Sequence, residues 1–543
     1  IEIIIEKYKT HPSIIKILEN NKNVNKFSFP LKSLEEIKKS MNGLNVKKPT
    51  TFRNIPAKVI SKYSDIYSEP LHILYNDSIY KGAFPDPMKR ADITPSYKKN
   101  DKCSKENYRP ISILSSLSKI FEKQMYDDIY EFMIDKLSPY LCGFRKGYST
   151  QYCLAVMLER FKKAIDKKDK FGALLTDLSK AFDCLNHELL IAKMHAYGFD
   201  REALKLVLSY LSNRKHRTKV NNQYSKWAEI LFGIPQGSIL GPLLFNIHIN
   251  DIFYVLQDSI ANFADDTTPY AIKSSYEELV ESLQIDCDSM VAWFHQNFFT
   301  LNADKCKLLV YNRHDMSINI DGEYITCDKS VKLLGIKIDN ELTFKEHISN
   351  ICKKVSLKLH ALARVSKFIN EDKLRLILKA FIESQFSYCS LIWMFHNRTL
   401  NNKINKLHER ALRLVYKDDA STFRELLDKD NSFTIHERNL QKLAIEMFKA
   451  KNKLSPDFMQ TIFQREENIY NLRKNRDFKV ENVRTTYFGT ETLKYRGPKV
   501  WDLVPEHIKS SNDLVEFKRK IKVWRPEGCT CRMCKVFIPN LGF

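Results

Sequence analysis

Two adjacent carboxylates, Asp265 and Asp266, are the side chains of this sequence best suited to hold a divalent cation. They lie between two short apolar runs, residues 260–263 and 270–272, and this pattern predicts two strands joined by a tight turn. Neighbouring like charges repel each other, and a divalent cation relieves that repulsion because hard oxygen ligands suit Mg²⁺. An isolated Asp-Asp pair is more often a solvated turn, so the inference requires further carboxylates elsewhere.

A third carboxylate, Asp177, follows an apolar run with the length and flanks of a buried strand, residues 171–176. Residues 179–197 then show apolar side chains at helical spacing and stop at Gly198, which predicts a helix. Nucleotidyl transfer by two metal ions requires carboxylates from separate elements that converge on ions about 4 Å apart. Asp177 with the Asp-Asp pair is the minimal set, although Asp177 alone could also be a helix N-cap.

A glycine-rich run, residues 233–242 (GIPQGSILGP), separates these carboxylates. Its glycines permit a sharp turn and a close approach of the backbone to a ligand. Gln236, which precedes Gly237, offers a paired donor and acceptor. A helix that begins after Ser238 would present its N-terminus to anions. The run is therefore a candidate nucleotide-binding loop.

Three segments in order resemble motifs A, B and C of reverse transcriptases: LTDLSKAFD (175–183), GIPQGSILGPLLFNIHIND (233–251) and FADD (263–266). More narrowly, the set is similar to the LINE-type, non-LTR retrotransposon branch near the jockey elements. Further blocks extend the resemblance over most of the chain: NYRPIS (107–112) within a fingers-like segment, CGFRKGYST (142–150), LNADKC (301–306) as motif D, LLGI (333–336) as motif E, and YRGP (495–498).

The resemblance implies an RNA-directed DNA polymerase, a nucleotidyltransferase that extends a DNA primer or target along an RNA template with dNTPs. Asp177, Asp265 and Asp266 would hold two Mg²⁺ ions, with Mn²⁺ as a possible substitute. Lys98 and Arg109 would be fingers cations that meet the incoming triphosphate, Arg109 as a bidentate fork. Each of these two could instead be an ordinary surface cation of a lysine-rich chain.

Phe182 stands five positions after Asp177, where reverse transcriptases place an aromatic ring under the sugar. A ring there would clash with a 2′-hydroxyl and favour deoxynucleotides, unless Phe182 is plain core on an amphipathic helix. Viral RNA polymerases tend to carry Asp at that position and Gly-Asp-Asp in motif C, whereas Ala264 precedes the Asp pair here. Lys305 is a candidate general acid for the leaving pyrophosphate, with a solvated loop lysine as the alternative.

The implied fold is α+β, with the right-hand arrangement of fingers, a palm with a small antiparallel sheet backed by helices, and a helical thumb. Helices are expected at residues 31–41 and 57–80, and residues 464–487 are the expected flexible loop or linker. The four predicted parts are a helical N-terminal extension (1–85), fingers and palm (86–340), thumb (341–420) and a largely helical C-terminal region with a Cys-rich tail (421–543).

Charge agrees with nucleic acid as the partner. The 543 residues suffice for several lobes with their own cores, and the net charge is +22. Residues 351–368 carry cations on one face and apolar side chains on another, so this predicted thumb helix could lie along a duplex and bind less tightly in salt. A solvated face is the alternative reading of any single such helix.

No stretch reaches the roughly 18 apolar residues that a membrane span requires. Residues 1–5 are too short and too quickly charged for a signal peptide. We therefore expect no membrane association and an intracellular protein. The resemblance implies RNP assembly in the cytoplasm and target-primed synthesis in the nucleus. The absence of an initiator Met suggests a fragment of a longer frame, in whose relatives an endonuclease domain usually comes first. The oligomeric state is not predicted.

Twelve cysteines without a secretory signal indicate a reducing compartment and mostly free thiols. Cys529, Cys531 and Cys534 differ from the scattered others, because their spacing could chelate zinc. A closed structural site requires four ligands, no histidine or cysteine follows Cys534, and the nearest preceding histidine is His507. A disordered tail is therefore expected, with a zinc knuckle for template RNA as the alternative.

Three departures from the family pattern suggest a drifting copy: KKPTTFRNIP at 47–56, Met88 and Cys306. None of them touches the predicted metal ligands. The alternative function is therefore a catalytically decayed relic that retains only nucleic-acid binding. The intact carboxylate set, the PQG run and Phe182 favour the polymerase.

Overall fold

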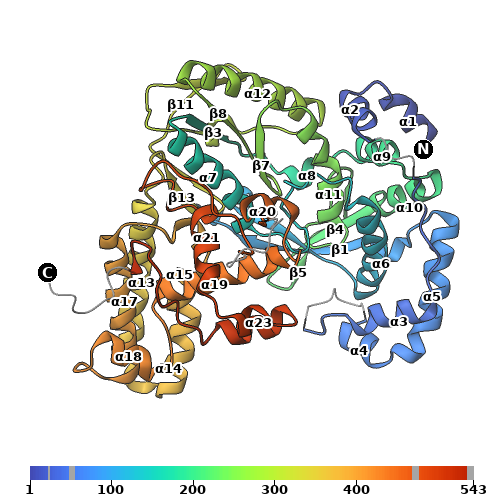
Figure 1. The fold of residues 1–543 in the computed structure, drawn as a ribbon. Coiled ribbons are helices and arrows are strands. Elements are labelled where there is room, and N and C mark those ends of the chain that lie inside the picture. The colour runs from blue at the N-terminus through green and yellow to red at the C-terminus, as the bar shows by residue number, and fades with distance from the viewer. Residues whose placement is uncertain (22–24, 48–54, 467–475, 535–543) are drawn as a thin grey trace. The chain divides into compact units, whose positions relative to one another are not determined.

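The computed structural model describes residues 1–21, 25–47, 55–466 and 476–534 (Figure 1). Its contacts divide the chain into two compact units, and the chain passes between them several times. Unit 1 consists of residues 1–144, 176–257 and 286–305; unit 2 consists of residues 145–175, 258–285 and 306–543. The predicted division at residues 85, 340 and 420 is not tested by this grouping and stays a prediction. Residues 48–54 of the departing KKPTTFRNIP segment lie outside the described residues.

Unit 1 contains a five-stranded mixed sheet with the order β2-β1-β4-β5, in which β6 also pairs with β4. An antiparallel hairpin, β1 with β2, lies beside β4, which runs parallel to β1. The strands are β1 (Arg90–Tyr97), β2 (Tyr108–Ile113), β4 (Arg214–Val220), β5 (Gln223–Tyr224) and β6 (Ala228–Ile230).

Helices make up much of the rest of unit 1. The α-helices are α1 (Glu2–Tyr8), α2 (Pro12–Asn20), α3 (Leu34–Asn42), α4 (Ala57–Lys62), α5 (Ser64–Lys81), α6 (Ser116–Met133), α8 (Ala181–Cys184), α9 (His187–Tyr197), α10 (Arg201–Leu211) and α11 (Gly241–Ile249). Short 3₁₀ turns are η1 (Asp86–Lys89), η2 (Lys105–Asn107), η3 (Asn250–Tyr254) and η4 (Ala303–Lys305).

The two helices predicted near the N-terminus are present with different bounds. The first begins at Leu34 because Ser33 caps it: the Ser33 hydroxyl accepts from the Glu36 N–H, and the Glu36 carboxylate accepts from the Ser33 N–H. The second is two helices, α4 and α5, because the backbone leaves the helical region at Tyr63, with φ −109° and ψ 35°. Spacing of apolar residues does not reveal either boundary.

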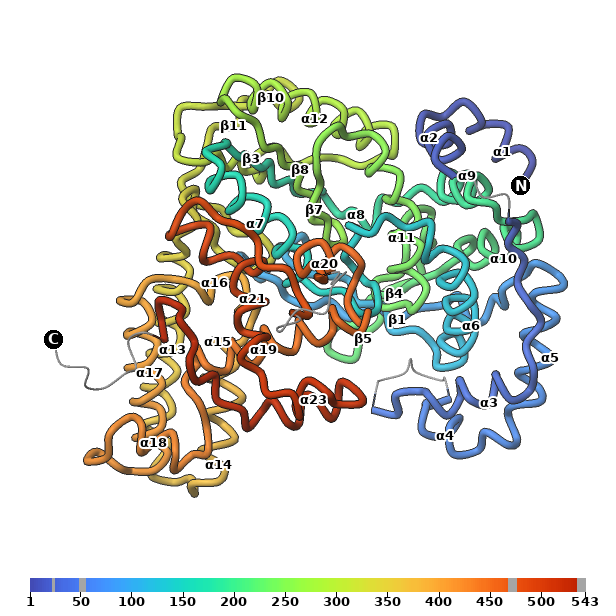
Figure 2. Tube along the Cα trace, viewed as in Figure 1, coloured from blue at the N-terminus to red at the C-terminus, as the bar shows by residue number. Residues whose placement is uncertain are grey.

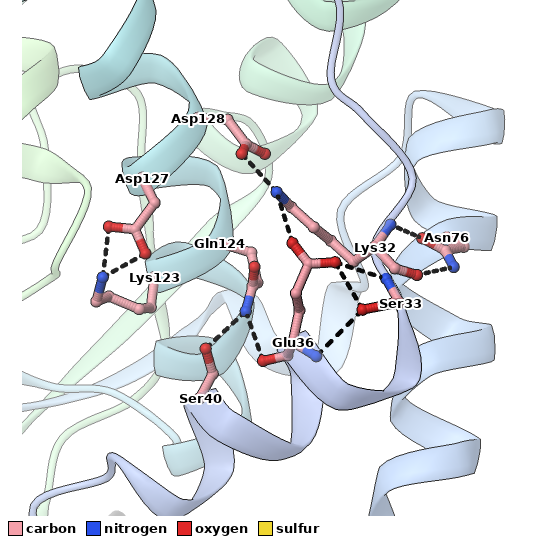
Figure 3. Close-up of polar contacts among 9 residues, drawn as sticks. All are labelled: Lys32, Ser33, Glu36, Ser40, Asn76, Lys123, Gln124, Asp127 and Asp128. Atoms are coloured by element: carbon pink, nitrogen blue, oxygen red, sulfur yellow. Dashed lines mark hydrogen bonds and ion pairs between the residues drawn. The ribbon is translucent and has the colours of Figure 1, made fainter.

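A polar cluster fastens the segment before α3 to α5 and α6 (Figure 3). The Lys32 ammonium lies 2.5 Å from the Asp128 carboxylate of α6, and both side chains are nearly buried. Asn76 of α5 accepts from the Lys32 N–H and donates to its carbonyl, at 2.9 Å each. Gln124 of α6 donates to the Glu36 carbonyl at 3.2 Å. These contacts join the segment around Lys32 and α3 to α5 and α6.

Unit 2 contains the small antiparallel sheet that the sequence predicted, with the order β7-β8-β3-β9. Every neighbouring pair in it is antiparallel. Its strands are β3 (Lys170–Leu175), β7 (Ser259–Phe263), β8 (Asp266–Lys273) and β9 (Lys307–Val310). The strand predicted at 171–176 and the hairpin predicted around the Asp pair are both confirmed.

Helices cover both faces of this sheet (Figure 1). Phe161 of α7 (Thr150–Lys167) stacks on Phe171 of β3 with ring centroids 4.1 Å apart. A Cβ built on the next residue, Gly172, would lie 2.6 Å from Leu283 of α12 (Tyr276–Gln296). Successive residues of a strand point to opposite faces, so α7 and this part of α12 lie on opposite sides of the sheet.

Two further antiparallel hairpins of unit 2 are β10 (Ser317–Ile320) with β11 (Glu323–Thr326), and β12 (Ser330–Leu333) with β13 (Ile336–Asp339). The second hairpin is the LLGI segment that resembles motif E. Its two turn residues, Leu334 and Gly335, have positive φ of 46° and 84°, which suits a tight hairpin turn. The Tyr388 hydroxyl donates to the Leu334 carbonyl at 2.7 Å and braces the turn.

The remainder of unit 2 is largely helical, as predicted for residues 341–543. The elements are α13 (Lys345–Val365), η5 (Ser366–Phe368), α14 (Glu371–Ile377), the π-helix η6 (Leu378–Glu383), α15 (Ser384–Ser387), α16 (Ser390–Trp393), α17 (Arg398–Tyr416), α18 (Phe423–Lys429), α19 (Ile435–Lys451), α20 (Asp457–Ile462), α21 (Leu493–Asp502), α22 (Glu506–Lys509) and α23 (Leu514–Ile521). Figure 2 shows α19, α21 and α23 side by side in the orange-to-red part of the trace.

The predicted amphipathic helix at 351–368 lies in α13 and η5. Ile351, Val355 and Leu359 of α13 are buried, whereas Lys353 and Lys354 are exposed, as predicted. The segregation is incomplete, because Leu357, Val365 and Phe368 are exposed as well. Of the predicted flexible segment 464–487, residues 467–475 lie outside the described residues. Among the helices that the structure describes, none has both the length and the apolar content of a bilayer span.

Candidate active site

Asp265 and Asp266 lie at the tip of the β7–β8 hairpin in unit 2. Phe263 pairs with Asp266, so Ala264 and Asp265 form a two-residue turn. Ala264 has a φ of +60°, a left-handed conformation that costs a non-glycine residue about 1–3 kcal/mol. Both carboxylate side chains are half-buried. The turn therefore holds the two acidic residues at a strained tip.

Asn262, a residue that the sequence did not single out, stabilises this turn. Its side-chain amide is fully buried and donates to the Ala264 carbonyl at 3.1 Å and to the Thr267 hydroxyl at 3.0 Å. These two bonds cross the base of the turn from one strand to the other. They offset part of the backbone strain and fix the orientation of the Asp pair.

Asp177 lies in unit 1, two residues beyond the end of β3. A short antiparallel ladder fastens this segment to residues 300–302: Leu178 bridges Leu301, the Asn302 N–H donates to the Asp177 carbonyl at 3.0 Å, and the Ser179 N–H donates to the Thr300 carbonyl at 2.9 Å. The segment that resembles motif D is therefore bound directly to the segment that resembles motif A.

Lys305 follows this ladder and places its ammonium 2.9 Å from Oδ2 of Asp177. The two side chains are 56% and 43% exposed, so the ion pair contributes little to stability, about 0–1 kcal/mol. The pair nevertheless shows that the Asp177 carboxylate accepts a cation. Lys305 is thus brought to a predicted metal ligand.

The helix predicted after Asp177 is interrupted. It consists of α8 and α9, with a break at Leu185 and Asn186. The Asn186 side chain accepts from the Leu189 N–H at 2.9 Å and caps α9, which favours a new helix start at that point. The predicted stop is confirmed, because Gly198 has a φ of 107° and ends α9.

Phe182 of α8 stacks on Phe245 of α11, with ring centroids 4.3 Å apart and an interplanar angle of 19°. Phe144 contacts the Phe182 ring edge-on, with ring centroids 5.8 Å apart. The carbonyl of Phe182 also accepts from the Ile234 N–H at 2.9 Å, which joins α8 to the glycine-rich loop. Aromatic packing therefore holds the half-buried Phe182 ring, and the hydrogen bond of its carbonyl holds the backbone at this residue.

The glycines of the loop permit close approach to the protein's own backbone. A Cβ on Gly237, whose φ is +126°, would lie 2.6 Å from the Ser112 carbonyl oxygen of β2. A Cβ on Gly233, whose φ is +79°, would lie 2.7 Å from the Asp183 backbone. Gln236 accepts from the Ser112 N–H at 2.8 Å and donates through its side chain to Asp183 at 3.0 Å. The PQG run thus ties α8 to β2.

The start of α11 differs from the anion site that the sequence predicted. The Ile239 N–H donates to the Glu122 carboxylate at 2.6 Å, and the Gly241 N–H donates to the Ser238 hydroxyl at 3.0 Å. Glu122 is fully buried on α6; burial raises its pKa, and the nearby Arg214 charge opposes that shift. A protein carboxylate therefore already occupies amides that the sequence had left for a ligand, and only the fold reveals it.

Lys98 and Arg109 lie together on the β1–β2 hairpin. Arg109 is opposite Ser96, and the Lys98 N–H continues the ladder by donating to the Asn107 carbonyl at 2.8 Å. Since Ser96 and Lys98 are two positions apart, Lys98 shares the face of Arg109, as a diagonal neighbour about 7–8 Å away. Both side chains are exposed. The same strand, β2, also holds the PQG loop through Ser112.

Cys529, Cys531 and Cys534 lie in unit 2, close to the start of α19. Cys531 is fully buried and the other two are half-buried. Residues 529–534 are therefore packed against the fold and are not the free tail that the sequence predicted. Residues 535–543 lie outside the described residues.

The predicted site residues are divided between the two units. Lys98, Arg109, Asp177, Phe182, Gln236, Gly237 and Lys305 belong to unit 1, whereas Asp265, Asp266 and the three cysteines belong to unit 2. Within unit 1, β2, the PQG loop and α8 are linked by the contacts given above, and Lys305 is linked to Asp177.

Part of the chain matches a known protein family. Residues 97–338 match the family described as reverse transcriptase (RNA-dependent DNA polymerase). The matched segment includes Asp177, the PQG run, the Asp pair and Lys305. This segment of the chain is therefore similar to reverse transcriptases, which are nucleotidyltransferases.

The relatives include polymerases of mobile elements. The chain is 27% identical over 412 residues to the probable RNA-directed DNA polymerase from transposon BS of Drosophila melanogaster, an alignment that covers 72% of this chain and 45% of that protein. It is 28% identical over 410 residues to the RNA-directed DNA polymerase from mobile element jockey of the same species. This alignment covers 72% of this chain and 44% of that protein. It is 25% identical over 378 residues to the probable RNA-directed DNA polymerase from transposon X-element of Drosophila melanogaster, an alignment that covers 67% of this chain and 41% of that protein. The resemblance to the jockey-like non-LTR group is confirmed, and the chain spans less than half the length of these relatives.

Proposed function

We propose that this chain is an RNA-directed DNA polymerase of a non-LTR retrotransposon, which extends a DNA 3′-hydroxyl along an RNA template. The observation that carries the proposal is the register of β3 against β8. Ala173 lies opposite Tyr270, and the strands are antiparallel, so the end of β3 lies beside the start of β8 at Asp266. Asp177 follows Leu175, the last residue of β3, by two positions, a reach of at most about 7 Å.

Chain connectivity thus supports convergence of the three carboxylates. Asp177 and Asp266 stand in the segments that resemble motifs A and C, which would supply the metal ligands. The remaining carboxylate, Asp265, is the turn residue next to Asp266. Carboxylates from two separate elements would then face one site, as two-metal nucleotidyl transfer requires.

The donor set suits magnesium. Three carboxylates supply hard oxygen ligands, and the ion pair of Asp177 with the Lys305 ammonium indicates that this carboxylate accepts positive charge. Asp177, Asp265 and Asp266 would hold two Mg²⁺ ions, with Mn²⁺ as a substitute. The bound ions would lower the pKa of the primer hydroxyl and stabilise the leaving pyrophosphate.

The other residues bind and orient the substrates. Lys98 and Arg109 place two exposed cations on one face of a hairpin, where they would contact the triphosphate of a dNTP. Phe182, supported from behind by Phe245, would lie under the sugar and exclude a 2′-hydroxyl. Lys305 would donate a proton to the pyrophosphate. The exposed cations of α13 would bind the phosphates of the RNA–DNA duplex, with an affinity that falls with salt.

Primer extension on poly(rA)/oligo(dT) with dTTP and Mg²⁺ tests the proposal. A variant with Asp265→Asn and Asp266→Asn keeps the size of both side chains, and its incorporation rate should fall on the order of a thousandfold. Asp258→Asn is the matched control, since Asp258 stands at the opposite end of the same hairpin, where it pairs with Lys273 at 3.2 Å. The control should keep its activity.

Equal incorporation by the wild type and the double variant would overturn the proposed site. A folded wild-type chain that binds the duplex in a salt-dependent manner without incorporating dTTP would instead establish the decayed relic.

A further inference from the structure

Metal-ligating side chains from two distant segments of unit 2 meet at the start of α19. His436 lies in the first turn of α19, and Cys531 and Cys534 lie after α23. The Nε2 atom of His436 is 3.1 Å from the Cys531 sulfur, and the ligand atoms of these three residues all lie within 4.8 Å of one another. Cys529 lies outside this group of three, but it belongs to the same short segment, two residues before Cys531. Three potential ligands are thus gathered in one place, and a fourth is close to them along the chain.

The separations suit a tetrahedral zinc site. With Zn–S bonds near 2.3 Å and a Zn–N bond near 2.0 Å, tetrahedral ligand atoms lie about 3.5 Å apart for N···S and about 3.8 Å for S···S. The distance from Nε2 of His436 to the Cys531 sulfur is 3.1 Å, slightly below the expected N···S value. No two ligand atoms of His436, Cys531 and Cys534 are more than 4.8 Å apart, which is about 1 Å above the expected S···S value. Three thiols select a soft metal such as zinc over magnesium or calcium.

The burial of Cys531 and His436 indicates that the cysteines of this segment have a common role. Cys531 has no exposed surface, and His436 is 5% exposed. A single buried cysteine is readily explained as a small apolar side chain, but two thiols beside one imidazole, with a third two residues away in the chain, are not. The Cys534 N–H also donates to the Cys531 sulfur at 3.4 Å, so the turn between the two cysteines holds this sulfur in place.

The surrounding contacts hold both segments in place. Gln441 of α19 donates to the Trp524 carbonyl at 2.7 Å, which fixes the chain just before the cysteines. Arg525 lies 3.8 Å from the Glu437 carboxylate, next to His436. Thr434 caps α19 through Glu437 and fixes its first turn. The ligands therefore come from backbone segments whose positions do not depend on the metal alone.

We propose that His436, Cys529, Cys531 and Cys534 form a closed structural zinc site that fastens the C-terminal segment to α19. The histidine that completes it is 93 residues before the first cysteine. Four protein ligands leave no open position, so the metal stabilises the fold and performs no chemistry. The site lies outside the polymerase carboxylates and does not depend on the proposed function.

Metal analysis of the full chain, purified with Zn²⁺ in the medium and then dialysed, tests the proposal. The wild type should retain about one zinc ion per chain. His436→Gln and Cys531→Ser should lose it, whereas His436→Cys should keep it, because a thiolate replaces one ligand by another. Cys352→Ser is the matched control, since Cys352 is a half-buried cysteine of α13 outside the cluster, and its zinc content should not change.

Cobalt gives a second readout that identifies the ligands. The Co²⁺-loaded wild type should show the intense visible bands of tetrahedral coordination and a thiolate charge-transfer band, which His436→Cys should strengthen. Wild-type chain without retained zinc overturns the proposal, and so does an unchanged cobalt spectrum in His436→Gln. If the variants do not fold, the cobalt spectrum of the wild type decides: tetrahedral bands with thiolate charge transfer support the site, and octahedral bands overturn it.

Discussion

Gly237→Ala is the substitution that tests how the nucleotide-binding loop is held. The φ of +126° is unfavourable for any L-residue and costs about 1–3 kcal/mol. The new methyl group would also lie 2.6 Å from the Ser112 carbonyl oxygen, a backbone atom that no side-chain rotation can move. Overpacking of this kind costs about 1–3 kcal/mol more. The sum, about 2–6 kcal/mol, is a large fraction of the stability of a typical domain, about 5–15 kcal/mol.

Gly322→Ala is the matched control. Gly322 has a φ of +90°, but no atom lies within 4 Å of a Cβ built there, so only the conformational cost applies. Because the two glycines lie in different units, the readout is hydrogen exchange by mass spectrometry, which reports local opening at each site. Peptides around Ser112 and Gly237 should lose about 1–3 kcal/mol more protection in Gly237→Ala than peptides around Gly322 lose in the control. Equal losses would refute the inference that close approach to β2 requires this glycine.

Three further predictions concern single side chains. Phe182→Ala should reduce the preference for dNTPs over rNTPs by about 10–200-fold in primer extension, because the ring no longer excludes the 2′-hydroxyl; an unchanged ratio contradicts its role. Lys305→Met should change the free energy of unfolding by less than about 1 kcal/mol, since the ion pair of Lys305 with Asp177 is exposed. If Lys305 is the general acid, the same substitution should slow incorporation by about 10²–10⁴-fold. An unchanged rate contradicts that role. Burial lowers the pKa of Lys442 from 10.5 to about 8. Between these two pH values the folded state has released a proton that the unfolded state still binds. The free energy of unfolding should therefore rise from about pH 8 to 10.5, by up to about 1.4 kcal/mol per pH unit. Urea unfolding across that range should show a flatter profile for Lys442→Met, and identical profiles would contradict the shift.

The strands around the acidic residues could be predicted from the sequence because their signals are local. The apolar run at 171–176 and the hairpin at residues 260–272 depend on neighbouring residues only, and both are confirmed. Gly198 as a helix stop is confirmed for the same reason. Periodicity alone does not indicate which carboxylates act together, and the order of the motifs is the basis for proposing that these three form one site.

Residues that act through long-range contacts could not be predicted. Glu122 reaches Ile239 from 117 positions away, and His436 reaches Cys531 from 95 positions away. Asn262 is close in sequence to the Asp pair, but its two bonds depend on the shape of the turn. Beside the anion site predicted at the start of α11, the Ile239 amide already pairs with the buried carboxylate of Glu122, and no local pattern reports that contact.

Iron-directed cleavage tests most directly whether Asp177 and the Asp pair share one metal site. Fe²⁺ that replaces Mg²⁺, with ascorbate and peroxide, produces hydroxyl radicals that cut the backbone close to the ion. We predict cuts in both residues 175–180 and residues 262–268, suppressed by excess Mg²⁺ and lost from both segments in Asp265→Asn. Cuts in one segment only, or cuts near residue 177 that persist in Asp265→Asn, would contradict a shared site.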